Sequence, residues 1–284
     1  MIKDEYLWVE KYRPKTIDEC ILPERIKEKF KAIVKDGNIP NLLLPGSAGI
    51  GKTTVVKALA NELDADVMVV NGSLNAGIDT LRYDIMQFAS SVSFTGGRKL
   101  VLLDEADYLS GTVQAALRNF MEEYSKNCGF ALTCNFANKI IEPLHSRCSA
   151  IPFRIEKNER PEIAKQFMDR SIYILEAEGI TYDKKVLAEL IMKFMPDWRK
   201  VINELQKYAL TGSIDSGILK SFSDDSFKSL IGHMKNKNYT EVRKWIGENQ
   251  DLDTATIFRL FHDQASEMMV PSFHLLDHRR VQIS

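Results

Sequence analysis

The residues from Gly46 to Thr53 read Gly-Ser-Ala-Gly-Ile-Gly-Lys-Thr and fit the phosphate-binding pattern G-x-x-x-x-G-K-[ST] at every fixed position. Glycines let the backbone curl around an anion without Cβ clashes, so that loop N–H groups and the next helix N-terminus face the phosphate. The pattern predicts that Lys52 reaches the β- and γ-phosphates of a nucleotide and that the Thr53 hydroxyl binds Mg²⁺. The alternative is a glycine-rich turn with a chance Lys-Thr pair, which the apolar stretch before the loop and the helical pattern after it disfavour.

A second group of chemically competent residues ends another apolar stretch. The run Leu100–Leu103 is followed by Asp104 and Glu105, with Asp107 two residues further on. Beside a phosphate loop, such a strand places Asp104 near Mg²⁺ and Glu105 near the attacking water, whose proton a carboxylate can accept. Acidic pairs are common at strand ends, so this interpretation depends on the loop upstream. Asp107 has a simpler alternative, which is to cap the following helix.

Three further polar residues each allow two interpretations. Asn135 ends an apolar stretch and would hold the attacking water if its strand lies between the other two; otherwise it makes a turn. Arg147 is either a surface ion-pair partner or an arginine finger, a guanidinium that neutralises charge developing at the γ-phosphate. Arg199 opens a helix behind Asp197, its predicted N-cap, where a cation opposes the helix dipole. That conflict favours a phosphate contact, with an ordinary solvated arginine as the alternative.

These residues need a sheet to position them, and the first half of the chain supplies the pattern of one. Five stretches are mostly continuous apolar runs, typical of strands buried on both faces of a parallel sheet. Helical periodicity alternates with them, which predicts a doubly wound α/β domain. The predicted strands are 41–44, 66–70, 99–103, 130–134 and 150–153, and the predicted helices are 25–36, 54–63, 79–90 and 112–124.

Beyond residue 153 the pattern becomes helical. Helices are predicted over 160–178, 184–195 and 199–210, which form a small all-helical second domain. A third helical stretch covers 227–235, 240–250 and 253–268 before Pro271 breaks it. That third region is too small to close a core by itself, so we expect it to pack on a partner or to be truncated.

Bulk properties narrow the class of protein. The 284 residues suffice for about two domains. No apolar run approaches the roughly 20 residues that span a bilayer, and no signal peptide opens the chain, so we expect a cytoplasmic protein that does not contact membranes. The four cysteines form no C-x-x-C pair and are expected to be free thiols rather than zinc ligands. A net charge of −1 means that any DNA contact must come from a local basic surface.

Taken together, the motifs resemble those of AAA+ ATPases of the sliding-clamp-loader type. They are most similar to the large, ATP-binding subunit of T-even-like bacteriophage clamp loaders, and less similar to replication factor C small subunits. The resemblance covers residues 5 to about 265. Its most specific part is the Ser-Arg-Cys element Ser146–Cys148 together with Pro196–Gln206, which resembles the second sensor helix of the family. The matching stretches are Trp8–Glu19, Gly46–Thr53, Leu103–Asp107, Ala115–Ser125, Thr133–Asn135, Ser146–Cys148 and Pro196–Gln206.

The resemblance implies an α/β fold of three parts. It implies a AAA+ P-loop ATPase domain with a five-stranded parallel sheet over residues 1–155, a helical lid over 156–224 and a shortened helical collar for oligomerisation over 225–284. It also implies a set of site residues. The nucleotide-binding ones are Gly46, Ser47, Ala48, Gly49, Ile50, Gly51, Lys52, Thr53, Thr54, Tyr12, Arg13, Pro14 and Arg199. Thr53 and Asp104 would hold Mg²⁺, and Lys52, Glu105, Asn135 and Arg147 would be catalytic, with Arg147 supplied by the neighbouring subunit.

The resemblance further implies a mechanism and partners. Four copies of such a subunit join a small clamp-loader subunit in a heteropentamer, with ATP between neighbours. The ATP-bound spiral opens a ring-shaped sliding clamp and grips primer–template DNA, which triggers hydrolysis of ATP and release of the clamp. A phage-encoded protein of this kind would work in the host cytoplasm. Gln114 would link the acidic motif to neighbouring subunits, Asn71 would hold Glu105 inactive until DNA arrives, and Arg82 would contact DNA or couple it to the site.

The sequence departs from the family pattern in places, and other functions compete with this one. Gly77 stands where phage relatives carry a basic residue that faces template DNA, the collar is short, and the zinc module of bacterial cellular clamp loaders is missing. One rival is another AAA+ motor, such as a helicase loader or branch-migration motor. Another is a scaffold subunit that binds nucleotide without hydrolysing it, which Lys52, Glu105 and Arg147 argue against.

Overall fold

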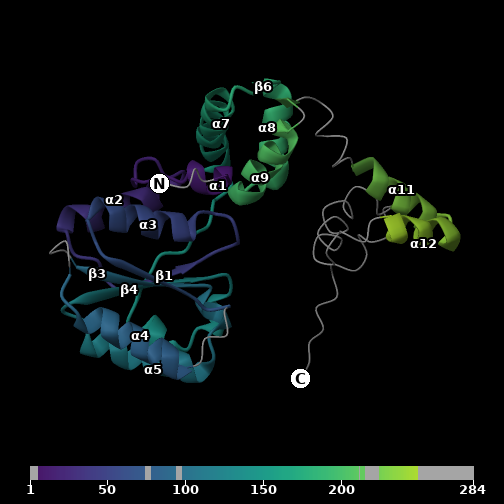
Figure 1. Ribbon diagram of the computed structural model, residues 1–284. Coiled ribbons are helices and arrows are strands. Elements are labelled where there is room, and N and C mark those ends of the chain that lie inside the picture. The colour runs from purple at the N-terminus through teal and green to yellow at the C-terminus, as the bar shows by residue number, and fades with distance from the viewer. Residues whose placement is uncertain (1–5, 74–77, 94–97, 211, 215–223, 249–284) are drawn as a thin grey trace. The chain divides into compact units, whose positions relative to one another are not determined.

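A computed structural model describes residues 6–73, 78–93, 98–210, 212–214 and 224–248 (Figure 1). The chain divides into two compact units, Met1–Ile218 and Leu219–Ser284. The first contains a sheet flanked by helices and a separate group of three helices, and the second contains a pair of helices.

The centre of the first unit is a five-stranded parallel sheet in the order β2-β3-β4-β1-β5. This agrees with the five predicted strands. The three central strands β3, β4 and β1 are buried on both faces as expected, whereas β2 exposes Val67 and Val69 and both residues of β5 are exposed. Alternate residues of β1, β3 and β4 enter one of two apolar clusters on opposite faces of the sheet. The strands are β1 (Leu42–Pro45), β2 (Val67–Asn71), β3 (Lys99–Asp104), β4 (Cys128–Cys134) and β5 (Ser149–Ala150).

Helices cover both faces of this sheet, as Figure 1 shows. Helices α2 (Glu24–Asp36) and α3 (Lys52–Glu62) share one apolar cluster with the sheet, and α4 (Ile78–Ser90) and α5 (Gly111–Glu123) share the other. Short helical turns join the strand ends: η1 (Ala106–Tyr108), η2 (Ala137–Lys139) and α6 (Glu142–His145). The sheet with helices on both sides is the doubly wound α/β arrangement that the sequence predicts.

Strand order decides which loops meet. Strand β4 pairs with β1 on one side and with β3 on the other, so it lies between the strand that leads into the phosphate loop and the strand that ends in the acidic motif. Asn71 lies beside Asp104 in the register of β2 and β3. The polar residues at the carboxyl ends of four strands therefore gather at one edge of the sheet, where ligands of open α/β sheets bind.

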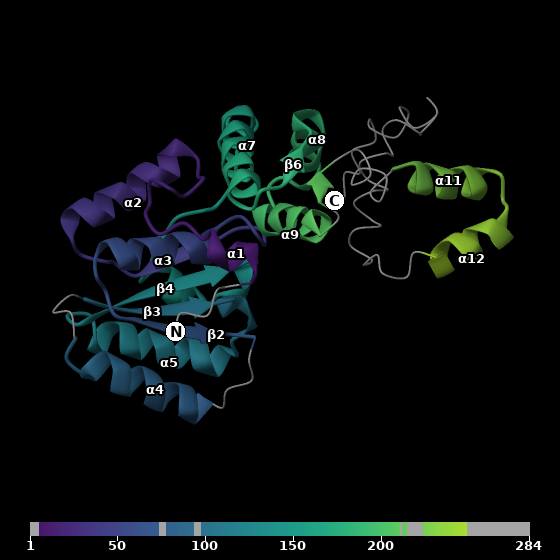
Figure 2. The same cartoon turned by 45° about the horizontal axis from the view of Figure 1, so that its top comes forward.

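The three-helix group contains α7 (Arg160–Ala177), α8 (Lys184–Phe194) and α9 (Trp198–Ala209). Its core includes a stacked pair of rings, Phe167 and Trp198, with centroids 4.4 Å apart. The N-terminal helix α1 (Trp8–Lys11) packs beside α9, so it lies against this group (Figure 2). The region is not purely helical, because the short strands β6 (Thr181–Tyr182) and β7 (Ser213–Ile214) pair in parallel. Two-residue strands carry no periodicity and were not foreseen.

The second unit is described only in part. Helices α11 (Asp224–Lys235) and α12 (Tyr239–Glu248) pack against each other, with Leu230 and Trp245 buried. The helix predicted over 253–268 lies outside the described residues, as does Gly77. Across the described part of the chain, no helix is both long and apolar enough to cross a membrane.

Candidate nucleotide site

A cavity of about 400 Å³ opens at the carboxyl edge of the sheet. Its walls come from the N-terminal segment, the phosphate loop, the ends of β2, β3 and β4, and the helices α7 and α9. All but two of the sequence-predicted nucleotide and Mg²⁺ residues line it. The members of this set are Tyr12, Arg13, Pro14, Ala48, Gly49, Ile50, Gly51, Lys52, Thr53, Thr54, Asp104 and Arg199, while Gly46 and Ser47 line a neighbouring hollow on the other side of the loop.

Lys52 begins α3 and is buried against the loop that precedes it. Its Nζ donates hydrogen bonds to the carbonyl oxygens of Gly46 and Ser47, at 2.7 and 2.8 Å, and to Oδ1 of Asn135 at 3.0 Å. Burial lowers the pKa of the Lys52 ammonium, because desolvation disfavours its charge. The three neutral oxygens stabilise the positive charge of Lys52 only in part, and a negatively charged nucleotide phosphate would stabilise it further.

Thr53 lies beside the acidic motif. Its Oγ1 donates to Oδ1 of Asp104 at 2.7 Å, and the hydroxyl of Thr133 donates to the same oxygen at 2.6 Å. The hydroxyl of Thr53 and the carboxylate of Asp104 form a pair of oxygen ligands of the kind that Mg²⁺ prefers, since this cation takes few protein ligands and keeps several waters. The residues present therefore fit the predicted Mg²⁺ site. Among the described residues, no cluster of three or more His, Cys, Asp and Glu is placed to hold a different metal.

Glu105 adopts a left-handed backbone conformation with φ of +57°, which is uncommon for a residue other than glycine. Its N–H donates to Thr133 Oγ1 at 3.1 Å, so β4 stabilises this turn. Asn71, at the end of β2, accepts hydrogen bonds from the N–H and hydroxyl of Ser73. Both Glu105 and Asn71 line the cavity, but no hydrogen bond joins their side chains in this conformation.

Asn135 follows β4 and reaches Lys52, so it lies between the phosphate loop and the acidic motif as the predicted water-holding residue would. Asp107 fixes this residue from behind: its Oδ2 accepts from the backbone N–H groups of Asn135 and Phe136, at 3.3 and 3.2 Å. Asp107 does not cap the following helix, which was the alternative interpretation of this residue. Ser110 is the N-cap of α5, through a bond from the Val113 N–H, because Asp107 lies one turn too early and faces β4.

The N-terminal segment closes the cavity on another side. Arg13 donates from Nη1 to Thr54 Oγ1 at 2.8 Å and pairs with Glu10, whose pKa it lowers through a hydrogen bond. Tyr12 donates its hydroxyl to Glu178 at 2.6 Å, and its carbonyl accepts from Arg170 of α7. Residues 10–13 therefore contact both the first turn of α3 and the three-helix group. Glu10 and Arg170 also line the cavity and were not predicted from the sequence. Glu10 could have been found because its charge lies close to Tyr12–Pro14 in the sequence, whereas no such signal marks Arg170.

Helix α9 contacts the phosphate loop directly. Asp197 is its N-cap, as predicted, and accepts from the Lys200 N–H at 3.0 Å. The Trp198 N–H donates to the Gly49 carbonyl at 3.2 Å, and a Cβ at Gly49 would lie 1.8 Å from Asp197 Oδ1. Arg199 follows at once and lines the cavity. The loop and the start of α9 are thus in van der Waals contact.

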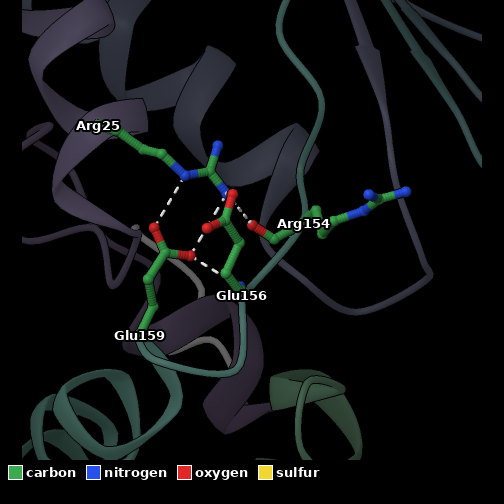
Figure 3. A network of polar contacts seen from close by, with 4 residues as sticks. All are labelled: Arg25, Arg154, Glu156 and Glu159. Carbon is green, nitrogen blue, oxygen red and sulfur yellow. Dashed lines mark hydrogen bonds and ion pairs between the residues drawn. The ribbon is translucent and has the colours of Figure 1, made fainter.

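The link between the sheet and the three-helix group is held by one arginine (Figure 3). Arg25, near the start of α2, donates to both carboxylate oxygens of Glu159, to the carbonyl of Arg154 and, at 3.7 Å, pairs with Glu156. Glu156 and Glu159 are also joined, through the Glu156 N–H. Because residues 154–159 immediately precede α7, this network ties the base of the helical group to α2.

Besides Gly46 and Ser47, three of the predicted site residues lie outside the cavity. Arg147, behind α6, is paired on the surface with Glu122 of α5. Gln114 is buried on α5, where its side chain bridges Leu109, Lys139 and Ile141 and so joins η1, η2 and α6 within one subunit. Arg82 is exposed on α4. These residues do not contribute to the nucleotide cavity of their own chain.

A doubly wound five-stranded parallel sheet, with a phosphate loop between β1 and α3 and acidic and polar residues on the adjacent strands, defines a nucleotide-binding ATPase of the AAA class. The sequence agrees: residues 42–156 match the family described as "ATPase family associated with various cellular activities (AAA)". Residues 159–220 match "Sliding-clamp-loader large subunit, AAA+ ATPase lid domain".

Relatives narrow this class. The sliding-clamp-loader large subunit of Enterobacteria phage T4 is 44% identical over 246 residues, which is 84% of this chain and 76% of that protein. The same subunit of Escherichia phage RB69 is 42% identical over the same shares. The chain belongs to the sliding-clamp-loader large subunit family. The replication factor C small subunit of Methanoculleus marisnigri is 40% identical over 72% of this chain and 63% of that protein.

A more distant likeness concerns the fold alone. A RuvB structure from Thermotoga maritima superposes with a TM-score of 0.59 at 20% identity and covers 80% of each chain. The matches to the two family models and to the phage subunits confirm the AAA+ fold, the ATPase activity and the clamp-loader family that the sequence predicts.

Proposed function

We propose that this chain is the DNA-dependent ATPase of a sliding-clamp loader, in which ATP binding prepares the clamp for loading and primer–template DNA triggers hydrolysis. The observation that supports this most is the division of the site. Lys52, Thr53, Asp104, Glu105 and Asn135 meet in one cavity, while Arg147 lies on the surface of the same chain. A site from which only the predicted arginine finger is missing is the arrangement expected when a neighbouring subunit supplies that finger.

Within the cavity, each residue has a proposed role that its contacts support. The loop N–H groups and Lys52 bind the β- and γ-phosphates of ATP, and Arg199 reaches the phosphates from the lid. Thr53 and Asp104 hold Mg²⁺, which when bound neutralises phosphate charge. Glu105 accepts a proton from the attacking water, and Asn135 orients that water. Tyr12, Arg13 and Pro14, which line the cavity, bind the base and sugar.

The proposed assembly follows from the family. Four copies of this chain and a small clamp-loader subunit form a pentamer that binds a sliding clamp and primer–template DNA, with Arg147 of one copy at the nucleotide of the next. The proposed domain division is an ATPase domain over 1–155, a lid over 156–224 and a collar over 225–284. The proposed coupling residues are Gln114, Asn71 and Arg82, of which Gln114 already joins three loops behind the site.

Two substitutions test the division of the site. In the complex assembled with its small subunit, clamp and primer–template DNA, Lys52→Ala should abolish ATP binding and turnover. Arg147→Ala should leave ATP affinity unchanged and lower DNA-stimulated turnover by about 10³-fold, because a finger acts on the transition state of the neighbour. Equilibrium nucleotide binding and steady-state phosphate release measure the two effects.

The exposed residues Lys35 and Arg160 provide matched controls, and their alanine variants should behave as wild type. Loss of ATP binding by the isolated Arg147→Ala chain would contradict a role in trans. Turnover that is indifferent to DNA in the complete complex would contradict the proposed function itself.

A further inference from the structure

The guanidinium of Arg147 is not free on the surface but is held by a carboxylate from another helix. Its Nε and Nη2 both donate to Oε1 of Glu122, at 2.8 and 2.5 Å. Its Nη1 donates to the Pro143 carbonyl at 2.9 Å and lies 3.4 Å from Ser146 Oγ. Glu122 stands in the last turn of α5, whereas Pro143 and Ser146 belong to α6 and its end. The side chain is therefore oriented by two separate elements.

These contacts leave part of the guanidinium available. Arginine carries five N–H donors in a planar fork, and the bonds to Glu122 use Nε–H and one hydrogen of Nη2. The second Nη2 hydrogen remains for an acceptor outside the chain, and 29% of the Arg147 side chain is exposed. A phosphate oxygen that approaches this edge can be bound without breaking the pair.

Stability does not account for the pair. The Glu122 side chain is 54% exposed, and ion pairs in such positions contribute little to the free energy of folding because solvent screens them and ordering two long side chains costs entropy. The larger effect of the ion pair is that it restricts the side-chain rotamers of Arg147. A group that acts on a transition state gains most from being oriented before the reaction begins.

We propose that Glu122 is the positioning residue of the arginine finger: it holds the Arg147 guanidinium in the orientation that meets the nucleotide of the neighbouring subunit. The proposal rests on the proposed function, in which Arg147 acts in trans. Glu122 itself touches neither nucleotide nor water and acts only through Arg147. The Arg147 hydrogen bond keeps Glu122 ionised by lowering the pKa of its carboxyl, which favours a permanent rather than a titrating contact.

The test uses the complete complex with DNA and clamp. Glu122→Ala should lower kcat by about five- to tenfold and leave KM for ATP and the melting temperature unchanged. Glu122→Gln keeps an acceptor oxygen at the same distance and should restore part of the lost rate, which a purely structural role would not predict. The neighbouring exposed residue Glu123 is the matched control, and Glu123→Ala should keep the wild-type kcat.

A double-mutant cycle shows whether the effect passes through the finger. In single-turnover measurements, Glu122→Ala should cause no further loss in the Arg147→Ala background. The same five- to tenfold loss in that background, or a wild-type kcat for Glu122→Ala, would overturn the proposal. If Arg147→Ala abolishes turnover while Glu122→Ala does not affect it, only the positioning role fails. If Arg147→Ala is itself without effect, the function in trans fails as well.

Discussion

At the scale of single residues, two carboxylates of the site each accept hydrogen bonds from two different residues. Asp104 accepts from Thr53 and Thr133 at one oxygen, so the Mg²⁺ ligand is oriented by both the loop and β4. Asp107 is 6% exposed and anchors the backbone after β4, while its second oxygen has no hydrogen-bond partner in the described part of the chain. Burial of a carboxylate costs free energy that the two backbone hydrogen bonds offset in part, and those bonds fix the turn that presents Asn135.

Removal of Asp107 should therefore affect both stability and turnover. Asp107→Ala leaves the N–H groups of Asn135 and Phe136 without an acceptor, which we expect to cost about 1–3 kcal/mol of unfolding free energy. Turnover should fall at least tenfold because Asn135 loses its position. Asp107→Asn keeps an oxygen acceptor and should lose less of both.

Urea unfolding and steady-state ATP hydrolysis measure these effects, with the exposed Asp36→Ala as the control. Equal damage from the alanine and asparagine variants would show that charge, rather than the two backbone bonds, is what Asp107 supplies.

At the scale of elements, the contact between α9 and the phosphate loop depends on one aromatic side chain. Trp198 is 7% exposed, stacks on Phe167 of α7 and donates its backbone N–H to Gly49. Its indole Nε1 is buried without a hydrogen-bond partner in the structure. The ring therefore stabilises the fold through packing, and its indole N–H group makes no favourable contribution.

Two substitutions separate these contributions. Trp198→Ala removes the stack and should cost about 3–5 kcal/mol of unfolding free energy, as expected for truncation of a buried aromatic ring. It should also weaken ATP binding, because the start of α9 loses its position against the loop. Trp198→Phe keeps a ring on Phe167 and should cost less than about 1.5 kcal/mol. Chemical unfolding measures both, and a phenylalanine variant as unstable as the alanine variant would contradict the packing argument.

The elements themselves were largely predictable, because buried parallel strands and amphipathic helices carry strong periodic signals. Helix α4 ends at Ser90 as predicted, and the observed strand boundaries differ from the predicted ones by three residues or fewer. The phosphate loop and acidic motif were readable because local spacing fixes their geometry. Contacts across the chain were not: nothing in the sequence around Arg25, Glu122 or Glu178 shows which distant residue each one meets. The role of Asp107 stayed open for the same reason, since its partners lie 28 and 29 residues away.

At the scale of the first unit, the N-terminal segment joins the ATPase core to the lid. Tyr12 and Lys11 both donate to the same oxygen of Glu178, at 2.6 and 2.7 Å, while Gln206 of α9 bonds to the backbone of Tyr6 and Trp8. Arg13 completes the link at Thr54. Because the segment also lines the nucleotide cavity, binding of a nucleotide and the position of the lid should be thermodynamically linked.

This link predicts a pH dependence. The hydrogen bond from Lys11, and then that from Tyr12, lower the pKa of Glu178 below its ordinary value of 4.5. A carboxyl with a lowered pKa in the folded state stabilises the fold above the unfolded pKa and loses that contribution as the pH falls through the folded value. The melting temperature of wild type should therefore exceed that of Glu178→Gln at pH 7, and the gap should close below about pH 4.5.

Scanning calorimetry between pH 7 and pH 3 measures this gap, with Glu189→Gln, an exposed residue on α8, as the control. A gap that stays constant across the range would mean that Glu178 acts through shape rather than charge.

The glycines of the phosphate loop carry one more consequence. A Cβ at Gly46 would meet the Phe153 carbonyl at 2.6 Å, and a Cβ at Gly49 would meet Asp197 at 1.8 Å. Both collisions are with protein on the outer side of the loop, not with the space that a phosphate occupies. The Gly46 collision is with backbone, and Gly49 has a φ of +72° that a side chain rarely adopts. Alanine is therefore disfavoured at both positions even in a chain that never bound nucleotide, so the glycines of this loop are required by the packing of the segment after β5 and the lid around it as well as by a phosphate.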